Sequence, residues 1–257
     1  MIRCKADNEI EYMRIAGRIV ASAHQAVKEA IQPGITTRQI NQIVEDVVTA
    51  HNAYPSFKGL YGFPTAACIS LNNILVHGIP DDTVLKNGDI VSVDIGACYH
   101  GYHGDSAWTY AVGNVSKEVE SLLRISEESL YEGLKQAKAG NHLTDISHAI
   151  GEYVYAHGYS VPRDYAGHGI GTSVHEDPTV PNFGPAGHGI LLKEGMTFAI
   201  EPMVLAGRPQ TKVLADGWGV ISKDGSLSAH YEHTIVITKN GYEILTILNK
   251  EERPDNG

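Results

Sequence analysis

The sequence predicts an α+β fold in which an antiparallel sheet is flanked by helix pairs. Two observations support this class: segments with helical spacing of apolar residues come in pairs, and runs rich in Ile and Val follow each pair. A third observation is that one pattern occurs twice along the chain, which indicates a pseudo-twofold duplicated scaffold. No linker rich in proline or glycine divides the 257 residues, so we expect a single domain over residues 1–257.

Four segments have the apolar periodicity of amphipathic helices. They cover about residues 7–31, a second stretch that ends near residue 51, and residues 117–137 and 143–157. Pro33 and Gly34 are expected to close the first helix, because proline and glycine are typical of helix ends. Thr36 or Thr37 is then expected to cap the second helix.

Strands are predicted where β-branched residues cluster. These runs lie at residues 66–71 and 90–97, and near 196–205 and 231–247. A hairpin centred between Tyr99 and His100 would make Asp94 and Asp105 cross-strand partners on one face. Opposed like charges destabilise a sheet. The two aspartates therefore either lie on a solvated surface or hold a cation between them.

The repeated pattern places a histidine and an acid at matching points of two segments. In each segment, Val-His-x-x-Pro precedes Leu-Lys-x-Gly, and an acidic residue ends the strand-like run that follows. The histidine and acid are His77 and Asp94 in the first copy, and His175 and Glu201 in the second. We interpret this as a duplication in which two halves face each other across a shared site.

The duplication extends upstream to the predicted helix pairs. The segment from Gly34 to His51 aligns with the segment from Gly140 to His157, with Gly, Ile or Val, Ala and His at matching positions. Two amphipathic helices alone could align this well by chance, but the later matching blocks follow in the same order. We therefore expect pseudo-symmetric halves at about residues 1–114 and 115–257.

Composition excludes several functional classes. The formal net charge of −10 argues against a basic surface for nucleic acid. No apolar run is long enough to span a membrane, and the N-terminus has no signal-peptide core. The three cysteines form neither a disulfide framework nor a paired-cysteine zinc motif, which favours a reducing compartment. We therefore expect a cytoplasmic protein.

Further candidate ligands occur at the ends of apolar runs and in a glycine-rich turn. Glu201 and Glu232 adjoin β-branched runs, where an ionised carboxylate is costly without a partner. His168 lies between glycines that allow close approach and unusual backbone angles. With Asp94 and Asp105 they make four carboxylates and one imidazole, which suit a pair of borderline divalent ions such as Mn, Fe, Co or Zn.

Together these residues and their neighbours resemble a known family, the type I methionine aminopeptidases of bacterial type, in peptidase family M24. The resemblance covers nearly the whole chain and implies the pita-bread fold. The matching strings occur in the family's order and spacing: His77-Gly78-Ile79-Pro80, Val93-Asp94-Ile95, Gly104-Asp105, Gly167-His168-Gly169-Ile170-Gly171, His175-Glu176-Asp177-Pro178, Ile200-Glu201-Pro202 and Glu232-His233-Thr234.

The resemblance implies a dinuclear metal centre within a single catalytic domain. Asp94 would bind one ion, Asp105 and Glu232 would bridge both, and His168 and Glu201 would complete the second site. The two divalent ions would be Co, Mn, Fe or Zn.

The catalytic roles also follow from the resemblance. Glu201 would move the proton, His175 would stabilise the tetrahedral intermediate, and His77 would contact the leaving amide side. The substrate would be the N-terminal methionine of peptides and nascent chains with a small second residue. We also expect transient contact with the ribosome, although the chain shows no docking module for it, and a monomeric enzyme.

The resemblance also implies a pocket for the methionine side chain, lined by Phe63, Cys68 and Trp218. An apolar surface with aromatic rings and sulfur suits a thioether. The chain departs from commonly seen bacterial members at Leu60 and Tyr61, where Tyr-His is frequent, and at Val174, where a larger apolar residue is frequent.

Other functions within the same fold remain open. An Xaa-Pro aminopeptidase or prolidase shares these ligands, but those relatives carry a large N-terminal domain, whereas here a helix is expected almost at once. A type II methionine aminopeptidase would need an insertion in the second half. A non-catalytic binding module of this fold would have lost its ligands, and all five ligand positions are intact here.

Overall fold

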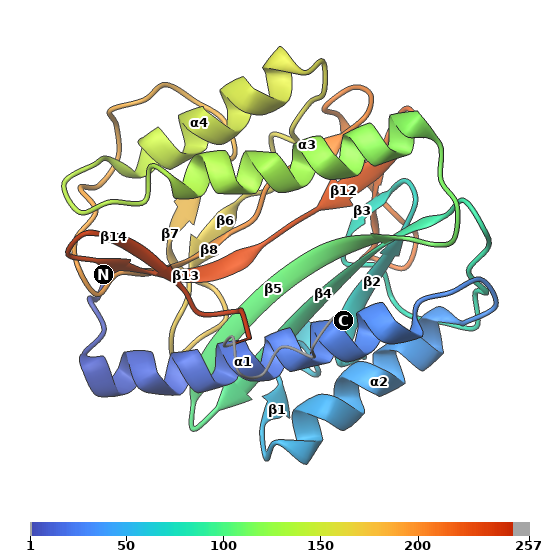
Figure 1. Ribbon diagram of the computed structural model, residues 1–257, viewed down its shortest axis with the longest axis horizontal. Coiled ribbons are helices and arrows are strands. Elements are labelled where there is room, and N and C mark those ends of the chain that lie inside the picture. The colour runs from blue at the N-terminus through green and yellow to red at the C-terminus, as the bar shows by residue number, and fades with distance from the viewer. Residues whose placement is uncertain (1, 249–257) are drawn as a thin grey trace, which may run out of the picture.

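Two helix pairs cover one face of a layer of antiparallel strands (Figure 1). The computed structural model of the protein describes residues 2–248. In the first pair, α1 (Asp7–Ala30) packs with α2 (Thr37–Ala50), and in the second, α3 (Lys117–Leu134) packs with α4 (Leu143–Ala156). The predicted helices are confirmed, with α3 ending a few residues earlier than expected.

The cap of α2 settles an alternative that the sequence left open. The Thr36 side chain accepts a hydrogen bond from the backbone N–H of Gln39 at 3.1 Å, and the Gln39 side chain accepts one from the backbone N–H of Thr36 at 2.9 Å. This reciprocal pair satisfies two N–H groups that the helix itself cannot satisfy. Thr36 is therefore the cap, and Thr37 begins the helix.

The strands of the described residues form several antiparallel sheets. Their bounds are β1 (Tyr54–Pro55), β2 (Ala67–Leu71), β3 (Ile74–Val76), β4 (Ile90–Tyr99), β5 (Tyr102–Ala111), β6 (Gly167–Gly169), β7 (Glu176–Val180), β8 (Thr197–Ile200), β9 (Met203–Leu205), β10 (Thr211–Val213), β11 (Val220–Ser222), β12 (Ser228–His230), β13 (His233–Thr238) and β14 (Gly241–Ile244). A short 3-10 helix, η1, spans Leu60–Gly62.

Two sheets carry most of the fold. In the first, β4 lies between β2 and β5 and also pairs with β1; in the second, the order is β14-β13-β8-β6-β7. The run predicted near 196–205 divides into β8 and β9 at Pro202, and the run near 231–247 becomes the hairpin of β13 and β14. Short strands such as β6 and β12 were not predicted, because three residues are too few for a periodic signal.

The hairpin of β4 and β5 is present, but its predicted register was wrong. The turn lies at His100 and Gly101, both with positive φ, so Tyr99 pairs with Tyr102. A two-residue turn of this kind follows the twist of the strands and fixes the pairing. Asp105 therefore faces Gly96 across the ladder, and Asp94 faces Ala107. The two aspartates are diagonal neighbours on one face rather than direct partners.

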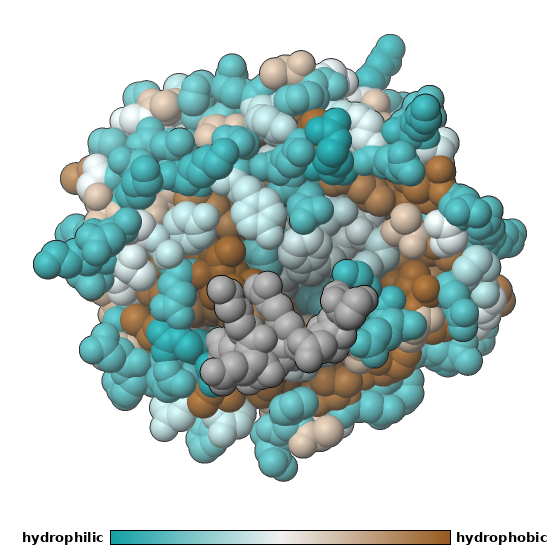
Figure 2. All heavy atoms as spheres, in the orientation of Figure 1, coloured by the Kyte–Doolittle hydropathy of each residue, from teal (hydrophilic) through white to brown (hydrophobic). Residues whose placement is uncertain are grey.

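Each half has its own hydrophobic core beneath its helix pair. One core gathers residues of α1, α2, β2 and β4, and the other gathers residues of α3, α4, β8 and β13. The outer face over the helices is largely hydrophilic, with hydrophobic side chains visible between the two pairs (Figure 2). The amphipathic helices thus bury their apolar faces against the sheets.

Matching hydrogen bonds recur before the second helix of each pair. The Gly34 N–H donates to the Leu85 carbonyl at 2.8 Å, and the Gly140 N–H donates to the Leu192 carbonyl at 2.9 Å. Both glycines have positive φ, which glycine adopts without strain. These are corresponding positions of the sequence repeat. The boundary between halves near residue 114 stays a prediction.

The two halves meet where β5 approaches β13. The Thr234 hydroxyl accepts a hydrogen bond from the Asp105 N–H at 3.0 Å and donates one to the Asp105 carbonyl at 2.8 Å. The Glu232 N–H donates to the Ala107 carbonyl at 2.8 Å. These bonds hold the backbones of two acidic residues side by side, although Asp105 and Thr234 are 129 positions apart in sequence.

Candidate metal centre and substrate cavity

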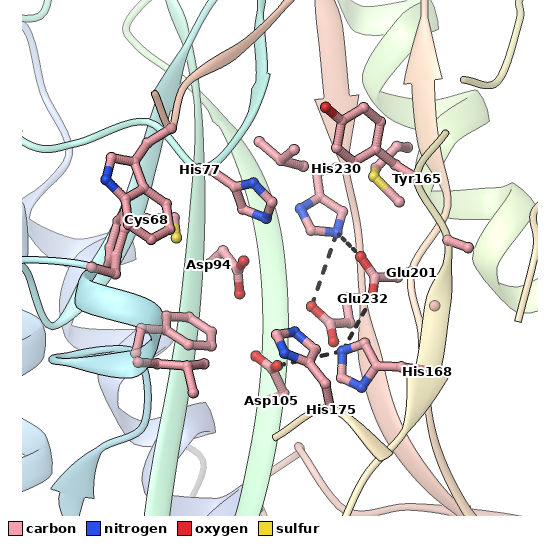
Figure 3. Close-up of a pocket in the computed structure, with 18 of the residues that line it drawn as sticks. Cys68, His77, Asp94, Asp105, Tyr165, His168, His175, Glu201, His230 and Glu232 are labelled. Atoms are coloured by element: carbon pink, nitrogen blue, oxygen red, sulfur yellow. Dashed lines mark ion pairs between the residues drawn. The ribbon is translucent and has the colours of Figure 1, made fainter. Parts of the chain in front are cut away.

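A cavity of about 410 Å³ is lined by residues from strands of both large sheets. All ten site residues predicted from the sequence line it. They are Phe63, Cys68, His77, Asp94, Asp105, His168, His175, Glu201, Trp218 and Glu232. Figure 3 shows the acidic and imidazole side chains converging on one point between the two halves.

The four carboxylates lie on or next to four different strands. Asp94 lies on β4 and Asp105 on β5, while Glu201 directly follows β8 and Glu232 directly precedes β13. Asp105 and Glu232 are only 3% and 2% exposed. Such burial of two acids at one point requires compensation by a cation or by protonation.

His168 joins this group from β6. Its Nε2 lies 3.3 Å from Glu201 Oε1 and 3.9 Å from Asp105 Oδ2. Single donor atoms of Asp105, His168 and Glu232 all lie within 4.8 Å of one another, which is a spacing that could hold a metal ion. A set of carboxylates with imidazole and no thiolate suits Mn, Fe, Co or Zn.

The glycines beside His168 are explained by close packing of strands. A Cβ on Gly167 would lie 2.5 Å from the Ala199 carbonyl oxygen, and one on Gly169 would lie 2.2 Å from the Asp177 carbonyl oxygen. Neither glycine has positive φ, so the expectation of unusual backbone angles was wrong. The expectation of close backbone approach is therefore confirmed, because any side chain there would push β6 away from β8 or β7 and move the His168 ring.

Burial raises the pKa of each acid in this cluster. Burial raises the pKa of Asp94 to about 7 and that of Glu201 to about 7. Burial raises the pKa of Asp105 well above its ordinary value, and the neighbouring Asp94 and Glu201 carboxylates add to this rise. Burial and the Asp105 charge likewise raise the pKa of Glu232. Without a cation, the folded cluster therefore holds protons at a pH where ordinary carboxylates are ionised, because burial and mutual repulsion disfavour its full ionisation.

Several buried polar atoms of the cluster have no hydrogen-bond partner among the described residues. They are Asp94 Oδ1, Asp105 Oδ1, Glu232 Oε1 and His230 Nε2. Buried polar atoms are nearly always paired, and each one that is not costs about 1–3 kcal/mol. Their convergence on one point fits a site built for cations, so the residues present fit the metal ions that the sequence implied.

His77 and His175 stand at the rim and are exposed toward the cavity. The His77 backbone has a φ of 59°, a left-handed conformation that is uncommon for a residue other than glycine. The His175 ring packs edge-on against His168, with centroids 4.5 Å apart. Both imidazoles can therefore reach a group bound beside the acidic cluster.

The predicted pocket residues form one apolar wall of the cavity. Phe63 packs edge-to-face on Trp218, with ring centroids 5.1 Å apart, and Cys68 and Val174 belong to the same buried cluster. Tyr61, one of the positions that depart from the family pattern, is 77% exposed and stacks on His175 at 6.1 Å.

The lining residues that sequence reasoning missed include Tyr165, Met203 and His230. For His230 a signal was available, because His230 and Glu232 are separated by one residue in a strand-like segment. Alternate residues of a strand point to the same face. No such signal marks Tyr165 or Met203.

Comparisons with known proteins agree with this geometry. The sequence profile of metallopeptidase family M24 matches residues 11–239. The chain is 54% identical to the methionine aminopeptidase of Clostridium perfringens, over 96% of this chain and 100% of that protein. The chain belongs to the methionine aminopeptidases. Membership in this family confirms the resemblance inferred from the motifs.

Solved structures of methionine aminopeptidases share the fold. The enzyme from Thermotoga maritima superposes with a TM-score of 0.95 at 46% identity, covering 96% of this chain and 100% of that one. The prolidase from Pyrococcus furiosus gives a TM-score of 0.78 at 25% identity, and this chain covers 66% of its length. The expected pita-bread fold is therefore confirmed.

No helix within residues 2–248 combines the length and the hydropathy needed to cross a bilayer.

Proposed function

We propose that this metallopeptidase removes the N-terminal methionine from nascent proteins whose second residue is small. The observation that carries the proposal is the convergence of buried, unpartnered carboxylate oxygens at the base of a cavity with an apolar wall. The alternative of an Xaa-Pro aminopeptidase is less well supported, since identity to the prolidase is 25% against 54% to a methionine aminopeptidase.

We propose that the cavity holds two divalent ions, Co, Mn, Fe or Zn. Asp94 would ligate one ion, His168 and Glu201 the other, and Asp105 and Glu232 both. The buried acids and their raised pKa values support this assignment, because cations would stabilise the ionised carboxylates. When bound, the ions would polarise the scissile carbonyl and lower the pKa of water.

The residues of the chain would divide the remaining work. Glu201, whose pKa is raised to about 7 by burial, suits a carboxylate that accepts and returns a proton near neutral pH. His175 would donate a hydrogen bond to the oxygen of the scissile carbonyl as negative charge develops there. His77 would contact the amide on the leaving side. Their exposure toward the cavity supports both roles.

The methionine side chain would occupy the apolar wall. Phe63 and Cys68 are 4% and 5% exposed, and with Trp218 they present aromatic carbon and sulfur to the cavity. Thioether sulfur makes favourable contacts with aromatic rings. We propose these three residues as the contacts that select methionine.

The cellular setting is proposed from the family and the composition. We propose a monomeric enzyme of the cytoplasm that meets its substrates as nascent chains, with transient contact with the ribosome. A net charge of −10 speaks against direct binding to nucleic acid.

Peptide hydrolysis with controlled metal content tests the function. Metal-loaded protein is expected to release methionine from Met-Ala-Ser, to act poorly on Met-Leu-Ser, and to leave Ala-Pro-Ser intact. Removing metal with a chelator should abolish release, and adding Mn or Co should restore it. Hydrolysis of Ala-Pro-Ser in preference to Met-Ala-Ser would overturn the proposal in favour of an Xaa-Pro aminopeptidase.

A further inference from the structure

His230 is a buried histidine within the acidic cluster that no motif had singled out. It ends β12, is 2% exposed, and lines the same cavity as the carboxylates. In Figure 3 its ring points between Glu201 and Glu232, from the side opposite His168. The acidic centre is therefore bordered by two imidazoles.

The Nε2 atom of His230 lies close to two carboxylates of the acidic cluster, as a metal ligand would. It lies 3.4 Å from Glu201 Oε2 and 3.9 Å from Glu232 Oε2. Despite this proximity it forms no hydrogen bond within the described residues, so its N–H or lone pair is not aligned with either oxygen. Carboxylate oxygens of Asp94, Asp105 and Glu232 likewise have no hydrogen-bond partner within the described residues.

These separations match those between ligands of one ion. Metal–ligand bonds of about 2.0–2.2 Å keep two ligand atoms of the same ion about 3 to 4.4 Å apart. His168 Nε2 lies 3.3 Å from Glu201 Oε1, and His230 Nε2 lies at a similar distance from the other oxygen, Oε2. Glu201 thus has one imidazole nitrogen beside each of its carboxylate oxygens.

The backbone of His230 is held firmly enough to fix its ring. The Thr109 hydroxyl accepts a hydrogen bond from the His230 N–H at 2.9 Å and donates one to the His230 carbonyl at 2.9 Å. β12 also pairs with β9, where His230 faces Met203. A ligand placed by rigid strands needs little reorganisation when the ion binds.

We propose that His230 Nε2 is a direct nitrogen ligand of the metal centre, which then contains two imidazoles, His168 and His230. This inference rests on the proposed metal-dependent function and deepens it. A second imidazole would favour Mn, Fe, Co or Zn still further over Mg or Ca, because imidazole is a poor ligand for the harder ions.

Counting the imidazole nitrogens tests the proposal without measuring catalysis. Protein labelled with ¹⁵N-histidine is loaded with Mn²⁺, and pulsed electron paramagnetic resonance measures the nitrogens coupled to the ion. Two coupled imidazoles are expected in the wild type and one in each of His230→Gln and His168→Gln. Mn²⁺ affinity by titration calorimetry should fall at least about tenfold in His230→Gln.

The possible results distinguish ligation by His230 from the metallopeptidase function on which it rests. One coupled imidazole in both wild type and His230→Gln, with equal Mn²⁺ affinity, would overturn ligation by His230 and leave the metallopeptidase function standing. Failure of the wild type to bind Mn²⁺, Co²⁺ or Zn²⁺ at all would overturn the proposed function together with this inference. Thermal unfolding of the metal-free variant checks that the substitution leaves the fold intact.

Discussion

Lys5 and Glu176 form a partly buried ion pair next to the turn that carries His175. Lys5 Nζ lies 2.6 Å from Glu176 Oε2, and the Lys5 side chain is only 4% exposed. The other carboxylate oxygen of Glu176 accepts hydrogen bonds from the backbone N–H groups of Thr172 at 2.8 Å and Ser173 at 3.3 Å. An N-terminal lysine thereby secures the turn in which a rim histidine sits.

Removing this lysine is expected to lower both stability and turnover. In Lys5→Met the Glu176 carboxylate loses its buried counter-ion, which should lower the free energy of unfolding by about 2 kcal/mol. Because the turn is then held less firmly, kcat should fall while bound metal stays constant. Chemical denaturation, metal analysis and steady-state kinetics measure the three quantities.

Two further variants give the Lys5 prediction its controls. Lys138→Met removes an exposed lysine and should change none of the three: stability, bound metal and kcat. Adding Glu176→Gln to Lys5→Met removes the stranded charge and should recover part of the lost stability. If Lys5→Met had wild-type stability and wild-type kcat, the pair would have no role in positioning His175.

The fold could be predicted from the sequence to the level of its elements but not of its register. Helices of fourteen or more residues, such as α2, give a strong periodic signal, and the matched His77 and His175 blocks exposed the duplication. The hairpin was misplaced because a turn at His100 and Gly101 and one shifted by a single residue leave the same alternation on each strand.

Only the site residues that lie in short local sequence motifs could be predicted from the sequence. Asp105 and His168 stand in recognisable local motifs, and the cavity contains both. His230 had one local signal, its spacing from Glu232, but its contact with Glu201 exists only in the folded chain. Lys5 was missed for the same reason, since 171 residues separate it from Glu176. Contacts of this kind are properties of tertiary packing, and no local pattern encodes them.

Replacing a shared carboxylate should separate metal binding from folding. Asp105→Asn is expected to abolish peptidase activity and to lower bound metal below two ions per chain. The metal-free fold should be at least as stable as the wild type, because folding raises the pKa of the buried Asp105 and so costs free energy at neutral pH, whereas asparagine does not titrate. Metal analysis and thermal unfolding test this, with exposed Asp46→Asn as the control. Full turnover in Asp105→Asn would contradict the dinuclear assignment.

His175 should matter to the reaction and not to the ions. In His175→Ala, kcat is expected to fall about 10²–10³-fold, which is the typical cost of losing one hydrogen-bond donor to a developing oxyanion. Metal content should remain that of the wild type, and KM should change little. His51→Ala, at an exposed helix end, is the matched control. A large loss of metal in His175→Ala would show that it acts as a ligand instead.

The metal-free protein is expected to lose stability as the pH rises from about 4 to about 7. Burial raises the pKa of Asp94 to about 7 in the folded chain, from an ordinary value of 3.8. Between these values the folded state binds more protons than the unfolded state, so the free energy of unfolding falls with increasing pH. Saturating metal should reverse the trend, because the ions bind the deprotonated carboxylates.

The contribution of one carboxylate can be isolated by comparing two metal-free proteins. Over this pH range Asp94→Asn should lose stability less steeply than the wild type, by at most about 1.4 kcal/mol per pH unit for the single proton involved. Urea denaturation at several pH values, with metal removed, gives both slopes, and titrating groups outside the acidic cluster cancel in the difference. Equal slopes would mean that Asp94 titrates normally in the folded chain, and its burial would then impose no demand for a cation.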